Sequence, residues 1–254
     1  MYFFKLFSII FVLALSACGS GDDLTPPTAE GLWRGIVTDT VVVVDANNKV
    51  INEYKEEFDA TGFVLPDGSY YFKYGEASDL SIFFGKSSMT DATIQSGQVF
   101  NRYRKQTRQG TFTGDVTTNS QLSMVFSPNN DDSFGLGIGV FSFLSDYNKA
   151  SSFSNLAGTY TNAGDITSNI VIDDKGGFTG ELVKGTVSDG KITILNPEKN
   201  LYKFDFTWKS ANDPAKFSGA AAFVDGKLLL ISPNEHVGSN EAKAHWITTE
   251  LTKQ

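Results

Sequence analysis

The strongest local concentration of charge is a basic run made of Arg102, Arg104, Lys105 and Arg108, with Tyr103 inside it. The chain as a whole carries a formal net charge of -8, so this run is where an anionic partner would bind. Lipid A phosphates, an anionic glycan or an acidic protein all fit that chemistry. The same residues also suit a solvated edge strand and turn, because basic side chains on exposed edges discourage aggregation. The sequence leaves both interpretations open.

Three other groups of residues are candidates for metal or nucleotide chemistry. The two histidines, His236 and His245, lack cysteine or carboxylate companions at any zinc spacing. Residues 129–132 read Asn-Asn-Asp-Asp, which supplies oxygen ligands without the spacing of a calcium loop. The glycines at 135, 137 and 139 have no lysine after them, so they do not form a phosphate-binding loop. We therefore expect no metal and no cofactor.

The glycine run is better explained as a strand. Leu136, Ile138 and Val140 then share one face, and the glycines share the other. A face without side chains admits a neighbouring backbone or aromatic ring. Carboxylates are plentiful, so an acid and base pair of a hydrolase could form in three dimensions without leaving a motif. No motif indicates one, and we expect that the protein is not an enzyme.

Composition indicates an all-β protein. Of the 254 residues, 41% are hydrophobic, and the chain has 21 phenylalanines, 24 glycines and only 7 prolines. This balance favours aromatic-packed strands separated by glycine turns over helical bundles. The acidic charge, with a pI of about 4.8, makes nucleic acid a poor partner. The single cysteine, Cys18, excludes an intrachain disulfide framework.

Residues 1–17 have the layout of a secretory signal peptide. Lys5 precedes an uncharged run from Leu6 to Leu15, and small residues follow. The run is too short for a confident membrane-spanning helix. Cleavage after Ala17 would remove Lys5 and leave 237 residues with a formal charge of -9.

The end of this segment, Leu15-Ser16-Ala17-Cys18, resembles the lipobox of bacterial lipoproteins. The resemblance implies that the Cys18 thiol is diacylated, that the signal is cut before it, and that the new amine receives a third acyl chain such as palmitate. Because each buried CH₂ contributes about 0.8 kcal/mol, three chains would anchor the protein firmly. In the lipoproteins that this segment resembles, an aspartate after the cysteine goes with retention at the inner membrane. With Gly19 at that position, the resemblance implies the outer membrane, facing the periplasm or the cell surface. The alternative is an ordinary signal peptide that leaves a soluble protein.

The remaining chain divides into a tether and two β-rich parts. Residues 18–29 are small, acidic or proline, and they cannot form a packed core. We expect an N-terminal β domain over 30–147 and a C-terminal β domain over 148–254, with a short helical turn between Asp146 and Leu156. Alternation such as Tyr202, Phe204, Phe206 and Trp208 against charged neighbours predicts strands with one buried face.

Turn signals separate these strands. Pro66-Asp67-Gly68, Asp189-Gly190 and Asp225-Gly226 predict hairpins, and the C-terminal tail favours a strand over a helix. The expected fold class is therefore two small antiparallel β-barrels or β-sandwiches.

Two motifs suggest a family resemblance. Gly31-Leu32-Trp33 resembles the first-strand motif of lipocalins, and Gly158-Thr159-Tyr160 opens the second part in a similar way. The whole layout resembles a group of poorly characterised two-domain Gram-negative envelope lipoproteins, which implies an architecture and no activity.

Three functions remain open on these grounds. The leading one is a membrane-anchored, non-enzymatic module that binds a small apolar ligand, a glycan or a protein. A structural or assembly role in the outer membrane comes second, and an acid–base hydrolase third. A wide apolar cavity would support ligand binding. Interiors filled by aromatic residues would favour a surface or structural role; the candidates are Phe63, Phe72, Phe204, Phe206 and Trp208.

Overall fold

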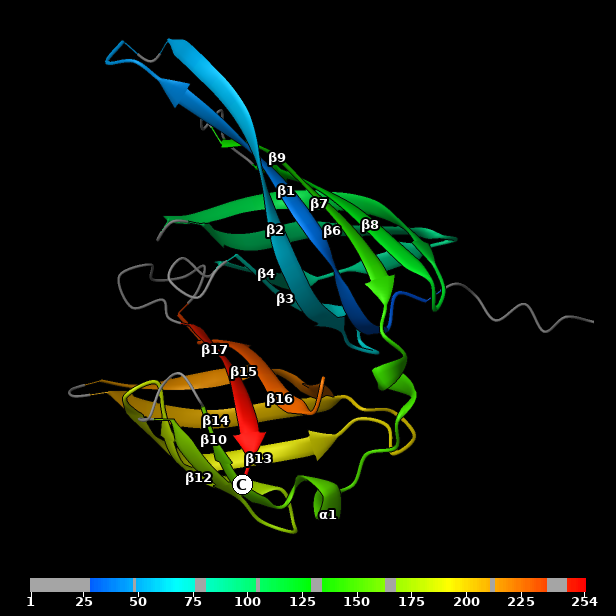
Figure 1. Cartoon of the computed structure of the whole chain (residues 1–254), viewed down its shortest axis with the longest axis vertical. Helices are drawn as coiled ribbons and strands as arrows, with labels where there is room; N and C mark the ends of the chain where they lie inside the picture. The colour runs from blue at the N-terminus through cyan, green and yellow to red at the C-terminus, as the bar shows by residue number, and fades with distance from the viewer. Residues whose placement is uncertain are drawn as a thin grey trace, which may run out of the picture.

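The structure, a computed structural model, describes residues 28–47, 49–75, 81–103, 106–128, 134–162, 168–210, 213–236 and 246–254. These residues form two antiparallel β-barrels that follow one another along the chain and lie against each other (Figure 1). The expected fold class is confirmed, and barrels rather than sandwiches are the form that it takes.

The first barrel is a nine-stranded sheet that curls until it is nearly closed. Its strand order is β4-β3-β2-β1-β9-β8-β7-β6-β5, and a further pairing between β4 and β6 brings the sheet back on itself. The strands are β1 (Gly31–Val44), β2 (Val50–Val64), β3 (Ser69–Tyr74), β4 (Ser81–Lys86), β5 (Ser88–Thr90), β6 (Thr93–Tyr103), β7 (Gln106–Thr117), β8 (Gln121–Pro128) and β9 (Phe134–Phe143).

Alternation along these strands builds the interior of the first barrel. Tyr70, Phe72 and Tyr74 of β3 are at most 1% exposed, and the residues between them are only partly buried. The Phe72 ring stacks on Phe83 and packs against Phe141, with ring centroids 4.8 Å apart in both pairs. Such aromatic pairs contribute about 0.5–1.5 kcal/mol each beyond their buried area.

The second barrel is closed, and its strands pair in chain order from β10 round to β17. They are β10 (Gly158–Thr161), β11 (Asn169–Ile172), β12 (Gly177–Leu182), β13 (Gly185–Ile194), β14 (Tyr202–Ser210), β15 (Asp213–Val224), β16 (Lys227–Pro233) and β17 (Trp246–Lys253). Its core includes Phe178, Phe204, Phe206 and Phe217, of which Phe206 and Phe217 stack with ring centroids 5.2 Å apart.

A short helical connection joins the barrels. The 3₁₀ turn η1 (Ser145–Asn148) is followed by α1 (Phe153–Leu156), and the Ser152 hydroxyl accepts a hydrogen bond from the Asn155 amide as an N-cap. The helical turn expected between Asp146 and Leu156 is therefore present in two pieces. Within the described ranges, which omit residues 1–27, no helix has the length and apolar character to span a membrane.

The two barrels share a third hydrophobic core, which we call the seam. Leu32, Phe63 and Ile82 face outward from the first barrel and pack with Leu229 and Ile231 of the second; all five are at most 2% exposed. Charged pairs border this contact. Arg34 binds Asp225 at 2.6 Å, and Lys73 bonds to Glu250. The barrels are thus packed together through a buried hydrophobic interface rather than held only by a linker.

The seam corrects one prediction about the aromatic residues. Phe63 fills the seam and not the interior of the first barrel. Phe72, Phe204 and Phe206 are interior, as predicted, and Trp208 is partly buried at the edge of the second core, where its Nε1 donates to the Leu182 carbonyl at 2.7 Å.

The turn predictions have mixed outcomes. Asp225-Gly226 joins β15 to β16 with positive φ at both residues, as a two-residue hairpin requires, and the tail is the strand β17. Asp189-Gly190 is wrong as a hairpin. These two residues lie inside β13, where the register with β14 shifts between Ser188 and Lys191, so they form a bulge.

Candidate functional site

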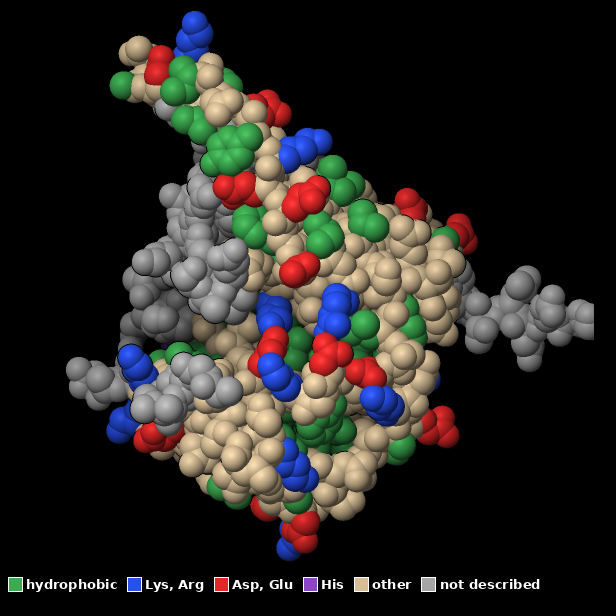
Figure 2. Space-filling view, viewed as in Figure 1, with side chains coloured by type: hydrophobic (Ala, Val, Ile, Leu, Met, Phe, Trp, Pro, Cys, Tyr) green, Lys and Arg blue, Asp and Glu red, His purple; other side chains and the backbone are tan. Residues whose placement is uncertain are grey.

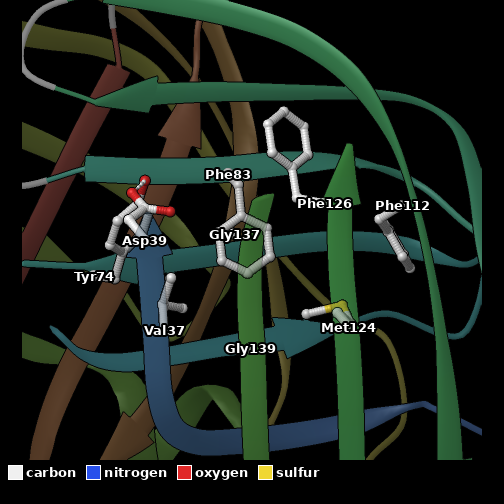
Figure 3. Close-up of a pocket in the computed structure, with 9 residues that line it drawn as sticks. All are labelled: Val37, Asp39, Tyr74, Phe83, Phe112, Met124, Phe126, Gly137 and Gly139. Atoms are coloured by element: carbon white, nitrogen blue, oxygen red, sulfur yellow. Dashed lines mark hydrogen bonds between the residues drawn. The ribbon is translucent and has the colours of Figure 1, made fainter. Parts of the chain in front are cut away.

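The interior of the first barrel leaves little space for a ligand. Its cavity has a volume of about 30 Å³ and is lined by side chains such as Val37, Phe112, Met124 and Phe126 (Figure 3). That volume holds one or two water molecules, whereas pockets for small molecules measure about 300–1,000 Å³. The filled interior favours the surface as the place where a partner binds.

One carboxylate, Asp39, lies at this cavity (Figure 3). It is 4% exposed, and the Tyr74 hydroxyl donates a long hydrogen bond of 3.4 Å to its Oδ2. Gly137 pairs with Asp39 across β1 and β9, and a Cβ there would lie 2.9 Å from Oδ1. Glycine at this position therefore makes room for the carboxylate. Among the residues whose burial is described, no second carboxylate is buried, so they supply no facing acid and base pair.

The predicted glycine face of β9 is confirmed. Gly137 and Gly139 face the interior, and the Phe141 ring covers Gly139 so closely that a Cβ would lie 2.4 Å from it. Ile138 and Val140 face outward and are 43% and 46% exposed.

Those two residues belong to an exposed apolar patch on the outside of the first barrel. Val140 pairs with Ile36 of β1, and Ile138 pairs with Val125 of β8, so the four side chains adjoin across three strands. Ile36 is 39% exposed and Val125 is 36% exposed. The patch can contribute contact area to an interaction on this side of the barrel.

The most prominent surface feature is a β-hairpin formed by β1 and β2, which we call the arm. Its outer part, residues 40–55, projects beyond the barrel (Figure 1). Among the described residues, β1 pairs with β9 as far as Val41. Thr40 to Val44 are all β-branched, which favours an extended backbone, and Asp45 closes the tip by accepting hydrogen bonds from the Asn47 and Lys49 amides.

The outer part of the arm has a described neighbour on one side only. β2 pairs with β1 along nearly its whole length, and the described residues of β3 pair with it from Ala60 to Val64. On that side, no strand among the described residues pairs with residues 50–55. An edge strand of this kind is a template for pairing with another strand.

Exposed apolar and charged side chains follow this edge. Val50, Ile51 and Tyr54 are 54%, 62% and 39% exposed. On one face of β2, Glu53, Lys55, Glu57 and Asp59 occur at every second position, and all four are exposed. Figure 2 shows hydrophobic, acidic and basic side chains together on the surface of the arm. The three apolar side chains are the part of this surface that association with another protein would bury.

A groove on the second barrel is the main competing site. It has a volume of about 470 Å³ and lies along β14 and β15, with Pro233, Asn234 and Glu235 at its side. Within it, Ser218 donates to Asp205 at 2.7 Å, and Lys203 lies 3.4 Å from the same carboxylate. The charged residues Asp189, Lys216 and Glu235 also line the groove. Its volume lies in the range of small-molecule pockets, so it is a second candidate site.

Buried tyrosines act as structural hydrogen-bond donors. Burial, with the nearby carboxylates of Asp67 and Asp205, raises the pKa of Tyr71 to about 12, and burial raises the pKa of Tyr160 to about 12. The Tyr160 hydroxyl donates to the Leu156 carbonyl at 2.7 Å. These phenols keep their protons at neutral pH and are poor candidates for general bases.

The charged side chains beside the seam lower the pKa of the Glu250 carboxyl. Partial burial favours the neutral form of Glu250, but the ammonium groups of Lys73 and Lys227 outweigh it and keep the pKa of this carboxyl below its usual value. Lys227 lies 3.5 Å from Glu250. This network connects the barrels and is partly exposed to solvent.

Several predicted site residues lie outside the described part of the chain. Cys18 and the rest of residues 1–27 are among them, as are Arg104, Lys105, His245 and residues 129–133. Arg102 lies in β6 and Arg108 lies in β7, and these two strands pair with each other around both residues. The side chains of the two arginines are not described. His236 is described and lies 4.0 Å from Glu235. No three metal-binding side chains converge within the described ranges.

Sequence reasoning missed the arm. A usable signal was present, because five β-branched residues, a polar turn and a second extended run form a hairpin pattern. What the pattern does not show is that β3 pairs with only the last third of β2.

Comparisons with known proteins give little further information. No protein-family model matches the chain, and no curated protein matches it. Among solved structures, the chain is similar to the crystal structure of a "putative outer membrane protein" from Bacteroides fragilis. The identity is 16%, the match covers 89% of this chain and 97% of that chain, and the TM-score is 0.29. At so low a TM-score the likeness supports no inference, so the fold rests on the strand pairing described above.

Proposed function

We propose that this protein is a lipoprotein of the outer membrane, anchored through Cys18, that binds a protein partner through the arm and performs no catalysis. The observation that carries the proposal is the combination of a first barrel with little interior space and an exposed arm, on which the described residues place no strand beside residues 50–55 on one side. A small apolar ligand inside the first barrel would need far more space than about 30 Å³.

The position of the arm supports this role. Thr28, where the described chain begins, lies at the end of the first barrel that holds residues 64–68, and its amide donates to the Thr118 hydroxyl. The tip of the arm is at the opposite end of β1. A tether over residues 18–29 therefore joins the membrane to one end of the barrel and leaves the arm at the other. At about 3.3 Å per residue, the tether spans at most about 40 Å.

The anchor is tested by Cys18→Ala, with Ser20→Ala as the matched control. We expect the alanine variant to lose metabolic labelling with a fatty acid and to move from the membrane to the soluble fraction, because it has no thiol to acylate. The control should stay labelled and membrane-bound. Continued labelling of Cys18→Ala would disprove the lipid anchor.

The binding role is tested by photo-cross-linking in cells. A photoreactive phenylalanine replaces Tyr54 on the arm or, as a control, Val171, which is 50% exposed on the closed second barrel. We expect one discrete adduct from position 54 and none from position 171. The absence of an adduct at 54, or the same adducts from both positions, would refute the proposal that the arm binds a partner.

A further inference from the structure

We infer that the exposed apolar patch on the outside of the first barrel binds an amphipathic helix of another protein, one whose apolar stripe is bordered by lysine or arginine. The patch consists of Ile36, Val125, Ile138 and Val140. It is a second surface, beside the base of the arm, and it goes beyond the function proposed above. The inference follows from the clustering of these side chains, the pairing of their strands and the carboxylates on either side of them.

The four side chains form one continuous group. Val140 pairs with Ile36 and Ile138 pairs with Val125, and the two residues of β9 stand two positions apart on the same face. Among the residues whose burial is described, nine large hydrophobic side chains are exposed: four form the patch, three lie on the arm and two lie on the second barrel. Single exposed apolar side chains are normal, whereas a group that adjoins on one face marks an interaction surface.

The backbone at the patch is already paired, so only side chains are available to a partner. β1 lies between β2 and β9, and β8 lies between β9 and β7. Ile36 pairs with Asp59 on its other side, and Val125 pairs with Thr113. Sheet faces of this kind are covered by helices or by a second sheet. From β1 to β8 the patch is about 10 Å wide, which matches the diameter of about 10–12 Å of one α-helix with its side chains.

Carboxylates border the patch on both sides. On one side, β2 presents Asp59 and Glu57 next to β1. On the other side, Asp115 of β7 pairs with Ser123, which pairs in turn with Val140. All three carboxylates, which we call the flanking carboxylates, are exposed. Figure 2 shows hydrophobic and acidic side chains next to one another on the face of the first barrel that carries β1 and β2.

The flanking carboxylates form no ion pair within the described part of the protein. Arg34 lies on the same outer face but binds Asp225 of the second barrel at 2.6 Å. Lys55 is the one basic side chain beside Glu57 on that face of β2. Three carboxylates therefore outweigh one available cation, and this face attracts a basic partner.

The spacing of the flanking carboxylates suits a helix that is basic on both borders. β2 and β7 are four strand spacings apart, which is about 19 Å along the sheet. A helix seated on the patch between them would hold its apolar stripe over β1, β9 and β8. Lysine or arginine on each border of the stripe has a long flexible stem and would reach the carboxylates while its methylene groups cover apolar surface.

A second copy of the chain is a poor occupant of the patch. It would set its own flanking carboxylates against those of the first copy, and each chain carries a net charge of -8. A stable dimer also buries about 800 Å² on each partner, which four partly exposed side chains do not supply. A single basic helix needs less contact area and forms a weaker, reversible complex.

The test uses the mature chain from residue 18 onward, produced without its acyl chains, and a labelled peptide of leucine and lysine about five helical turns long. Leucines at i, i+3, i+4 and i+7 give it one apolar stripe. Fluorescence anisotropy measures affinity, and circular dichroism measures helix formation on binding. We expect the peptide to bind as a helix. A peptide of the same composition, with its leucines scattered around the helix, should bind at least about tenfold more weakly, because it cannot bury a stripe.

Matched variants locate the apolar contact. Val140 is 46% exposed in the patch, and Val171 is 50% exposed on the second barrel, so Val171→Ser is the control for Val140→Ser. We expect Val140→Ser to weaken binding about fivefold through lost apolar burial, and the control to change it less than about twofold. Val125→Ser, on a different strand of the patch, should act as Val140→Ser does.

A second matched pair tests the charge selection. Asp59→Asn with Asp115→Asn neutralises one carboxylate on each border of the patch. Asp174→Asn with Glu181→Gln makes the same change in net charge at exposed positions of the second barrel. We expect the first pair to weaken binding about threefold to tenfold and to reduce its salt dependence, and the second to change it less than about twofold.

Each contrary result has a clear meaning. No binding of the striped peptide, or equal binding of the scattered one, would overturn the inference of a helix. Equal effects of Val140→Ser and Val171→Ser would overturn the patch as its site, and equal effects of the two double variants would overturn the charge selection. A dimer of the protein that Val140→Ser dissociates would assign the patch to a second copy. None of these results depends on the adduct at position 54, so the proposed function stands or falls by its own experiment.

Discussion

The two barrels differ in how they treat their strand edges. In the second barrel every strand has a neighbour on each side, and β10 pairs with β17 to complete the ring. In the first barrel β4 and β6 bring the sheet together, but β2 extends ten residues beyond its partner β3. Closure removes the edges that promote association. This contrast is the basis of our proposal that the second barrel is a scaffold and that the first carries the recognition element.

The largest expected difference is in the free energy of unfolding, between a substitution in the core of the second barrel and one on the arm. Phe204 is fully buried in the second barrel, so Phe204→Ala should lower the free energy of unfolding by about 3–5 kcal/mol. Tyr54 is 39% exposed, and Tyr54→Ala should cost less than about 0.5 kcal/mol. Urea denaturation measures both. A loss at Tyr54 as large as that at Phe204 would mean that the arm is part of a core.

The seam gives the next largest effect. Leu229 packs in the seam, and its neighbour Leu228 packs inside the second barrel; both are at most 2% exposed. Either alanine substitution should cost about 2–4 kcal/mol. Only Leu229→Ala removes contact between the barrels, so calorimetry should show one unfolding transition dividing into two for this variant alone. Two transitions for Leu228→Ala as well would contradict the assignment of the seam.

Glycine positions provide a smaller contrast. A Cβ at Gly139 would lie 2.4 Å from the buried Phe141 ring, so Gly139→Ala should cost about 1–3 kcal/mol through overpacking. Gly226 has nothing within 4 Å of such a Cβ but has φ of +77°, and Gly226→Ala should cost about 1 kcal/mol from backbone strain. Thermal denaturation ranks the two variants. A larger loss of stability for Gly226→Ala than for Gly139→Ala would show that the Phe141 ring can move aside to accommodate the added methyl group.

The smallest expected effect concerns pH and the bond between Lys73 and Glu250. The folded-state pKa of Glu250 is lowered, so the stabilisation is present above the pKa of the unfolded chain and is lost as pH falls through the folded-state value. A double-mutant cycle with Lys73→Met and Glu250→Gln should give a coupling of about 0.5–1 kcal/mol at pH 7, because both groups are partly exposed. The coupling should decline as pH falls through the folded-state pKa of Glu250 and approach zero once the carboxyl is protonated. A coupling that does not change with pH would exclude the charge pair as its source.

Much of the fold could be predicted from the sequence because strand alternation is local. Tyr202 to Trp208 alternate with charged residues, and the structure buries the aromatic side of that strand. The bulge at Asp189-Gly190 was not predictable, because the same dipeptide closes a hairpin or kinks a strand according to what lies opposite. Alternation shows which residues share a face of a strand, but it does not show what covers that face. For this reason Phe63 was predicted to lie in a barrel interior, whereas it lies in the seam. The seam and the free edge of β2 depend on tertiary pairing, which no local pattern encodes.

Hydrogen exchange of the protein alone tests most directly whether the first barrel holds a free edge. The account predicts that alternate amides of residues 50–55, beside which the described chain places no strand on one side, exchange within seconds. It predicts that the amides of β14, which pair on both sides, exchange slowly. Protection across all of residues 50–55 as strong as that in β14 would contradict the account, because the edge would then already be covered.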